Sequence, residues 1–295
     1  MASYETTLIV AVLVTATLSA CSTAPRSGGA PRPQVFYQAH RGGLREVPEN
    51  TMVAFRHAWR CPGAVPEVDV RTTKDGVMVC MHDETPARTT NAPGALKDRP
   101  VSQIVFEELR QWDAGVRFDR KYAGEKVPAL REVFDEMRGR PERQIYLDLK
   151  GVDLEALVAL IEEYGLNDRV IFVHGAPAMC IRLSGLFPGA RTMTWLSGDP
   201  DTIRTRFETL AAGGFEGISQ IQLHLKTTKP IGDIEYVFDD AFLRAAFEKA
   251  QAAGAELQLR PFRFDTESLQ GLVDTGVRWF VTDEPRRFAE TLAQK

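Results

Sequence analysis

The chain has 295 residues, of which 44% are hydrophobic and 26% are charged, and its formal net charge is −4. This composition is ordinary for a globular protein, and the length suffices for one large barrel or two smaller domains. The mixed, slightly acidic charge argues against nucleic acid as a partner, because a phosphate backbone is usually met by a strongly basic face.

The N-terminal residues carry features of an export signal. An apolar run at residues 6–18 is shorter than the roughly 20 residues that span a bilayer. It leads into Leu-Ser-Ala-Cys at residues 18–21, which resembles the lipidation box of bacterial lipoproteins. We therefore expect a lipoprotein-type signal peptide at residues 1–20, lipidation of Cys21, and a Pro/Gly/Ser-rich tether at residues 21–34.

This arrangement predicts an exported protein anchored to a bacterial membrane, and Ser22 favours the outer membrane or the periplasm. Residues 1–5 lack Lys and Arg, which leaves a misassigned start codon or a plain signal peptide as the alternatives. The remaining cysteines, Cys61, Cys80 and Cys180, show no metal-ligand spacing and are read as small buried residues. A bridge between Cys61 and Cys80 is left open.

From residue 35 onward, short β-rich runs alternate with amphipathic stretches. The expected strands are residues 36–40, 65–71, 144–150, 169–174, 190–196, 217–225, 255–260 and 277–282, and the expected helices include 50–60, 154–164, 201–212, 240–253 and 268–274. This alternation predicts an α/β fold, a closed (β/α)₈ TIM barrel over residues 35–295. An open doubly wound sheet is the alternative, but no glycine-rich dinucleotide fingerprint follows the first strand.

One long interval, residues 83–125, interrupts this rhythm and predicts a small insertion after the second strand. It contains a short helix at residues 106–112 and three aromatic residues, Trp112, Phe118 and Tyr122, which we expect to cap the barrel mouth. Residues 77–82 alternate after a Lys-Asp-Gly turn, which predicts a hairpin that carries His82 back over the site.

Polar residues cluster where the first three strands of the barrel end, the end that bears catalytic groups in this fold. Glu67 and Asp69 are two residues apart on one strand, so their side chains point to the same side and can bind one hard cation such as Ca²⁺ or Mg²⁺. A structural ion pair with Arg41 or Arg71 is the alternative. Without a cation the two carboxylates would repel each other, which favours the metal site.

Five short strings follow one another in the order and spacing of the glycerophosphodiester phosphodiesterase family, which this chain resembles over residues 36–285. They are HRG at 40–42, PENT at 48–51, EVDV at 67–70, TKDG at 73–76 and HD at 82–83, and VPAL at 127–130 and TDEP at 282–285 add to them. The resemblance implies a (β/α)₈ barrel with an insertion after the second strand, and an activity that releases an alcohol and sn-glycerol 3-phosphate.

The resemblance also implies roles for individual residues. Glu67, Asp69 and Asp148 would hold a divalent cation, with Glu49 close enough to contribute. Arg41 and Lys150 would contact the phosphate, and His40 and His82 would form the acid–base pair. Which histidine is the base stays open, as does the nucleophile, which is either a water or the neighbouring glycerol hydroxyl acting through a cyclic phosphate.

Two positions depart from the family pattern. Asp148 replaces the usual Glu, so its carboxylate is one methylene shorter and a water can bridge it to the cation. Arg260 ends a Leu-Gln-Leu-Arg segment where the family commonly has Trp-Thr-Val-Asn, which adds a cation that would favour a more anionic substrate. His174, His224 and Trp195 lie near strand ends and are further candidates for the substrate pocket.

Two other functions remain as alternatives. A lysophospholipase D-like or sphingomyelinase D-like phosphodiesterase would act on a lipid and use an apolar surface of the insertion. A catalytically silent lipoprotein would use the barrel to bind an anionic ligand. The sequence leaves the natural alcohol, the cation and the oligomeric state open.

Overall fold

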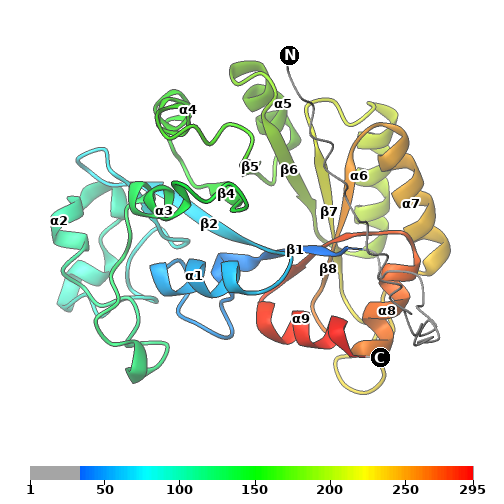
Figure 1. Ribbon diagram of the computed structural model, residues 1–295, viewed down its shortest axis with the longest axis horizontal. Coiled ribbons are helices and arrows are strands. Elements are labelled where there is room, and N and C mark those ends of the chain that lie inside the picture. Colours follow the sequence, from blue (N-terminus) through cyan, green and yellow to red (C-terminus); the bar gives the residue numbers. More distant parts are fainter. Residues whose placement is uncertain (1–33, 295) are drawn as a thin grey trace, which may run out of the picture. The chain divides into compact units, whose positions relative to one another are not determined.

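The computed structural model describes residues 34–294, so the predicted signal peptide and the lipidation at Cys21 lie outside the described part of the chain. Eight parallel strands form a closed barrel, because β1 pairs with both β2 and β9 (Figure 1). These strands are β1 (Phe36–Ala39), β2 (Ala64–Thr72), β4 (Ile145–Leu149), β5 (Val170–Val173), β6 (Arg191–Leu196), β7 (Gln220–Leu225), β8 (Glu256–Pro261) and β9 (Trp279–Thr282). The predicted (β/α)₈ barrel is confirmed.

Helices follow the strands and cover the outside of the barrel. They are α1 (Met52–Arg60), α3 (Leu130–Met137), α4 (Leu154–Glu163), α5 (Pro177–Leu186), α6 (Pro200–Ala212), α7 (Asp240–Ala252), α8 (Thr266–Asp274) and α9 (Pro285–Ala293). Four of them begin after an aspartate whose side chain accepts a hydrogen bond from the backbone N–H three residues later, which satisfies one free donor of the first turn. These caps are Asp153, Asp199, Asp239 and Asp265.

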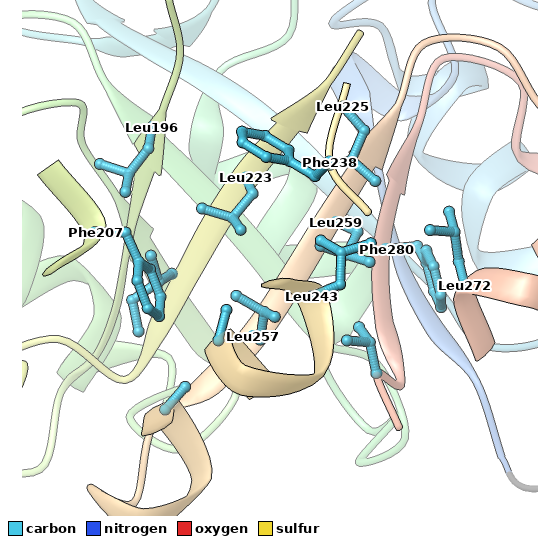
Figure 2. Packing of buried hydrophobic residues seen from close by; sticks show 14 of the residues in the cluster. Leu196, Phe207, Leu223, Leu225, Phe238, Leu243, Leu257, Leu259, Leu272 and Phe280 are labelled. Carbon is cyan, nitrogen blue, oxygen red and sulfur yellow. The ribbon is translucent and has the colours of Figure 1, made fainter. Parts of the chain in front are cut away.

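The largest apolar core lies between the barrel and its helices. Leu223, Leu257 and Leu259 point outward from β7 and β8 and pack against Phe207 of α6 and Leu243 of α7 (Figure 2). Buried strands of this kind carry nearly continuous apolar runs, as in the Val-Ile-Phe-Val sequence of β5. The outward-facing side chains of the strands are buried against the helices, so the side chains that alternate with them point into the barrel.

The inside of the barrel is more polar. The Gln222 amide nitrogen donates to the side-chain oxygens of Gln258 (2.8 Å) and Gln38 (3.3 Å), and the Tyr146 hydroxyl donates to Gln220 (2.8 Å). These side chains are buried, so the hydrogen bonds offset the cost of removing them from water. This network lies beneath the polar residues of the barrel mouth.

The segment after β2 forms the predicted hairpin and then a small lobe. β3 (Met78–Cys80) pairs antiparallel with β2. The lobe has its own core, which includes Val79, Met81 and Trp112, and its α-helix α2 (Phe106–Leu109) is shorter than the helix predicted at residues 106–112. Trp112 is only 7% exposed, so the expectation that it caps the mouth is wrong: its indole fills the interior of the lobe.

Two further observations concern the described residues. Cys61, Cys80 and Cys180 are free, so no bridge joins Cys61 to Cys80. Between residues 34 and 294, no helix has the length and apolar character needed to cross a membrane.

Candidate active site

A tight turn at the end of β1 brings His40 and Arg41 to the barrel mouth. Arg41 has φ 53° and Gly42 has φ 80°, both in the left-handed region. A side chain on Gly42 would place its Cβ 2.7 Å from the Cβ of Ala54 in α1, so glycine is required at this contact. The turn also aims the Arg41 backbone N–H at Glu67, to whose Oε2 it donates over 2.6 Å.

Three carboxylates meet at the centre of the site. One oxygen from each of Glu67, Asp69 and Asp148 lies within 4.8 Å of the others. Glu67 and Asp69 are each 1% exposed, and the β2–β4 register places Asp69 beside Asp148. Asn50 holds Asp69, because its amide donates to Asp69 Oδ2 (2.8 Å) and its carbonyl accepts from the Asp69 backbone N–H (3.0 Å).

Two positively charged side chains, Lys150 and Arg41, partly offset the negative charge of these carboxylates. Lys150 Nζ lies 2.8 Å from Asp148 Oδ2 and 3.4 Å from Asp69 Oδ1, and Arg41 Nε lies 3.4 Å from Asp69 Oδ2. The pKa of Glu67 is raised well above its usual value by burial and by the neighbouring Asp69 and Asp148. Three largely buried carboxylates whose negative charges repel one another form a set of oxygen ligands that suits a hard divalent cation such as Ca²⁺ or Mg²⁺.

Glu49 departs from the expected metal set. Its carboxylate accepts hydrogen bonds from Arg41 Nη1 (2.9 Å) and from Arg88 Nη1 and Nη2 (2.7 and 2.8 Å). It is not part of the carboxylate group formed by the other three residues. Because two arginines already engage both of its oxygens, Glu49 orients Arg41 in this structure.

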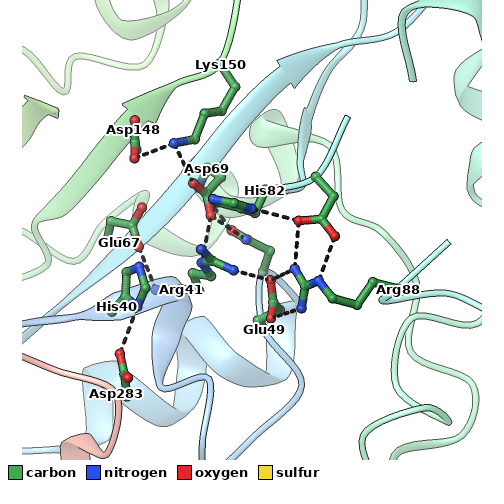
Figure 3. Close-up of polar contacts among 12 residues, drawn as sticks. His40, Arg41, Glu49, Glu67, Asp69, His82, Arg88, Asp148, Lys150 and Asp283 are labelled. Carbon is green, nitrogen blue, oxygen red and sulfur yellow. Dashed lines mark hydrogen bonds and ion pairs between the residues drawn. The ribbon is translucent and has the colours of Figure 1, made fainter. Parts of the chain in front are cut away.

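His40 is held by Asp283, whose Oδ1 lies 2.8 Å from His40 Nδ1 (Figure 3). Arg260 Nη2 lies 2.9 Å from the same nitrogen and 3.1 Å from the same oxygen. If Nδ1 had no proton, its lone pair would face a carboxylate oxygen at 2.8 Å. We therefore place the proton on Nδ1, where it is donated to Asp283, and the lone pair on Nε2.

The protonation of His40 follows from its surroundings. Burial lowers the pKa of this imidazole to about 4, and the positive charges of Arg260 and Arg41 act in the same direction, whereas Asp283 opposes them. His40 is consequently neutral at pH 7. A neutral imidazole with a free Nε2 is suited to accept a proton.

His82 is held in a similar way by a different loop. Its Nδ1 lies 2.7 Å from Asp83 Oδ1, and Arg71 donates twice to its backbone carbonyl, from Nε (3.0 Å) and Nη2 (2.7 Å). The hydrogen bond at Nδ1 leaves Nε2 free, and the side chain is 35% exposed. His82 is thus fixed at its backbone and at one ring nitrogen.

Both histidines line one cavity of about 320 Å³. Of the predicted residues, the cavity wall also includes Arg41, Glu67, Asp148, Lys150, Trp195, His224 and Arg260. The Trp195 ring lies beneath the Lys150 ammonium, 5.8 Å from its centroid. His174 departs from the expectation, because it lines a separate hollow formed by the loops that follow β4 and β5.

His224 is a neutral hydrogen-bonding group of this cavity. Its Nε2 lies 3.0 Å from the Gln222 side-chain oxygen, whose own amide nitrogen is directed to Gln258 and Gln38. Nε2 therefore carries the proton and Nδ1 is an acceptor. Burial, with Arg260 and His40 adding to it, lowers the pKa of His224 to about 3.

Sequence reasoning missed two residues of this site. Asp283 lies in the TDEP string at the end of β9, where its position at a strand end was the available signal. Arg88 contacts both Asp83 and Glu49 from the lobe that follows β3. No periodicity or strand-end rule indicates a loop residue of this kind, because its contacts depend on how the lobe folds back over the barrel.

Together the fold and the site define a (β/α)₈-barrel protein whose mouth carries two aspartate-held histidines and a group of three carboxylates with the geometry to hold a cation. Residues 40–287 match the model of the Glycerophosphoryl diester phosphodiesterase family. The chain belongs to this family.

Relatives and solved structures agree with this assignment. A glycerophosphodiester phosphodiesterase of Caldanaerobacter subterraneus is 42% identical over 139 residues, 45% of this chain and 55% of that protein. Another, from Bacillus altitudinis, is 36% identical over 155 residues, 49% of this chain and 61% of that protein. The matches thus span little more than half the length of these relatives.

Among solved structures, a glycerophosphodiester phosphodiesterase from Agrobacterium tumefaciens superposes with a TM-score of 0.70 at 26% identity, and the match covers 87% of this chain and all of that one. A phosphodiesterase of Oleispira antarctica, solved in complex with the product sn-glycerol-3-phosphate, has a TM-score of 0.67 at 23% identity over 89% of this chain and 97% of that one. At 23% identity, the similarity to the Oleispira antarctica protein shows a shared fold alone.

Proposed function

We propose that this protein is a metal-dependent phosphodiesterase that hydrolyses glycerophosphodiesters to an alcohol and sn-glycerol 3-phosphate. The observation that carries the proposal is the cavity in which His40 and His82, each held at Nδ1 by an aspartate, share a wall with the carboxylate group. Family membership supports the same reaction.

His40 is the general base in this proposal. Its Nε2 takes the proton of the attacking O–H, which belongs to a water or to the neighbouring hydroxyl of the glycerol, while a new P–O bond forms. Asp283 then faces the imidazolium that results, at the 2.8 Å separation of its Oδ1 from Nδ1. This carboxylate stabilises the charge that His40 acquires and keeps the ring in the orientation that the transfer needs.

His82 is the general acid. In its imidazolium form it donates the Nε2 proton to the oxygen of the departing alcohol as the old P–O bond breaks. Asp83 accepts the other ring proton, which holds the ring in this orientation. The two histidines end the step with their protonation states exchanged. When water attacks, proton exchange with solvent restores them. When the glycerol hydroxyl attacks, the product is a cyclic phosphate, which water then opens to glycerol 3-phosphate with His82 as the base and His40 as the acid.

Arg41 and Lys150 bind the phosphate. Both line the cavity, and both lie beside the carboxylate group that their charges partly offset. Glu67, Asp69 and Asp148 would hold the divalent cation, which when bound supplies further positive charge against the oxygens of the phosphoryl group. Arg41 and Lys150 act in the same direction as charge grows on those oxygens.

The test is release of glycerol 3-phosphate from glycerophosphocholine after treatment with EDTA and after addition of Ca²⁺ or Mg²⁺. We expect EDTA to abolish release, one or both cations to restore it, and His40→Ala or His82→Ala to lower kcat by roughly 10²–10⁴-fold. No release with any cation, together with cleavage of a lysolipid, would favour the lipid alternative. Binding of a glycerophosphodiester without cleavage would favour the binding protein.

We further propose that the chain is exported and anchored through a lipidated Cys21. The apolar run and the Leu-Ser-Ala-Cys string support this. When the protein is expressed in a bacterium, labelled palmitate should enter the wild type and should not enter Cys21→Ala. Labelling of both variants, or of neither, would contradict the anchor.

A further inference from the structure

We propose that Arg88, in the lobe that follows β3, is a positioning residue for the acid–base chemistry: it clamps Asp83, and through Asp83 it fixes the ring of His82. The inference rests on the proposed function, in which His82 protonates the departing alcohol. It assigns a role in the reaction to a residue outside the motifs of the barrel strands.

The guanidinium of Arg88 bridges two carboxylates (Figure 3). Towards Asp83, Nε lies 2.6 Å from Oδ2 and Nη2 lies 2.9 Å from Oδ1. Towards Glu49, Nη1 lies 2.7 Å from Oε2 and Nη2 lies 2.8 Å from Oε1. Each contact is the paired, planar geometry that a guanidinium forms with a carboxylate and that a lysine cannot reproduce.

Asp83 is the link to His82. Its Oδ1 accepts from Arg88 Nη2 and also contacts His82 Nδ1 at 2.7 Å. Arg71 fixes the His82 backbone carbonyl, whereas the ring itself is hydrogen-bonded to Asp83. The direction of the ring, and with it the position of Nε2, therefore depends on Asp83, and the orientation of Asp83 depends on Arg88.

The same guanidinium joins His82 to the phosphate side of the site. Glu49 accepts from Arg88 and also from Arg41 Nη1 (2.9 Å), and Arg41 Nε lies 3.4 Å from Asp69. One chain of contacts thus runs from His82 through Asp83, Arg88 and Glu49 to the guanidinium of Arg41. Arg41 keeps its own contacts with Glu49 and Asp69 when Arg88 is replaced, so we expect the loss of Arg88 to affect the proton donor and not the phosphate side.

The lobe holds Arg88 in a braced turn. Thr90 donates to the carbonyl of Pro86 from both its backbone N–H (3.0 Å) and its hydroxyl (2.8 Å), and Arg117 donates to the carbonyl of Thr90. An exposed ion pair usually contributes little, and Arg88 is 48% exposed. Here the paired geometry, the braced turn and the largely buried Glu49 distinguish Arg88 from an ordinary surface arginine.

The test compares two substrates that share the glycerol phosphate and differ in the leaving group. Choline leaves glycerophosphocholine as an alkoxide that needs a proton, whereas p-nitrophenolate leaves sn-glycerol 3-(p-nitrophenyl) phosphate without one. A misplaced acid should therefore slow only the first reaction. We expect Arg88→Gln to lower kcat on glycerophosphocholine by about 10- to 100-fold and on the p-nitrophenyl ester by less than about threefold.

Three further variants complete the design. Arg88→Lys keeps the positive charge but lacks the planar guanidinium, so its kcat on glycerophosphocholine should lie between those of the wild type and Arg88→Gln. This variant replaces Arg88→Gln in the test if the latter does not fold. His82→Ala should show the same dependence on the leaving group more strongly. Arg110→Gln is the matched control, because Arg110 forms a paired contact with Glu132 (2.8 and 2.9 Å) at the same lobe, and its activity on both esters should equal that of the wild type.

The outcomes separate this inference from the function on which it rests. Equal losses on the two esters in Arg88→Gln, or no loss on glycerophosphocholine, would overturn the positioning role while the wild type remains active. Equal losses on both esters in His82→Ala would overturn the acid role of His82 and the inference with it. A wild type inactive on both esters would overturn the proposed function itself.

Discussion

Replacing Asp283 by Asn tests the assignment of His40 as the base. The Asp283 carboxylate accepts from His40 Nδ1 at 2.8 Å and so keeps the lone pair on Nε2. In Asp283→Asn the charge is lost, and Arg260 Nη2, already 2.9 Å from Nδ1, becomes free to donate to it. The proton of the neutral ring would then move to Nε2, where it blocks acceptance of a proton from the nucleophile.

The size of the effect follows from the charge that the carboxylate faces. An imidazolium and a carboxylate whose charge centres are about 4 Å apart interact by about 4 kcal/mol at an effective dielectric constant of 20. If that stabilisation is lost from the transition state, kcat falls by roughly 10³-fold. We expect the substitution to lower kcat on glycerophosphocholine by 10²–10⁴-fold, with little change in KM.

The assay is steady-state release of glycerol 3-phosphate from glycerophosphocholine, with thermal unfolding of each variant as the control for folding. A second substitution, Arg260→Gln, should cost less in the Asp283→Asn background than in the wild type, because the donor that displaces the His40 proton is then gone. A folded Asp283→Asn variant with kcat within about threefold of the wild type would refute the assignment of His40 as the base.

Three other predictions concern the cation, acid stability and the turn after β1. Glu67→Gln should raise the melting temperature in EDTA, because it replaces a carboxyl group whose charged form is disfavoured by burial and by Asp69. It should also abolish the rise in melting temperature that Ca²⁺ or Mg²⁺ gives the wild type, and a cation-induced rise of wild-type size would contradict this. In the folded protein the pKa of His224 is lowered to about 3, so as the pH falls the imidazole is protonated in the unfolded chain before it is protonated in the folded one, and stability is lost from about pH 6.5 towards pH 3. Denaturant midpoints of His224→Asn should therefore fall less steeply over that pH range than those of the wild type. Gly42→Ala should destabilise the protein by about 1–3 kcal/mol, measured by denaturant unfolding, because its Cβ would meet Ala54 at 2.7 Å and φ is 80°; an unchanged midpoint would show that the turn can adjust.

Most of the barrel could be predicted from the sequence because its strands are short, apolar and evenly spaced. The strand predicted at residues 65–71 is β2 (Ala64–Thr72), and that predicted at 255–260 is β8 (Glu256–Pro261). β7 begins at Gln220, three residues later than predicted. Gly217, with φ 66°, belongs to the turn before the strand, and an apolar pattern does not reveal a backbone angle.

The helices α5 and α9 were not among those predicted. α5 contains Ser184 and Gly185 near its end, which weaken a helical pattern. α9 begins at Pro285, the last residue of the TDEP string, which resembles the closing strand of the family. Both helices start with proline in their first turn, where its fixed φ is compatible with a helix.

The site, like the fold, was predicted in part from the sequence. Residues at strand ends, such as His40, Glu67 and Lys150, were found because parallel strands bring their carboxyl ends together. Contacts that depend on loops were not found: Asp283 against His40, Arg88 against Asp83, and the engagement of Glu49 by two arginines. These arise from the packing of segments distant in sequence, which strand periodicity does not encode.

The bond broken in the proposed reaction can be read directly by ³¹P NMR of glycerophosphocholine mixed with the protein and a divalent cation. We expect the substrate resonance to be replaced by that of sn-glycerol 3-phosphate, free choline to accumulate in equal amount, and both changes to stop in EDTA. Formation of phosphocholine and glycerol instead, or an unchanged substrate resonance with every cation tried, would rule out the proposed reaction.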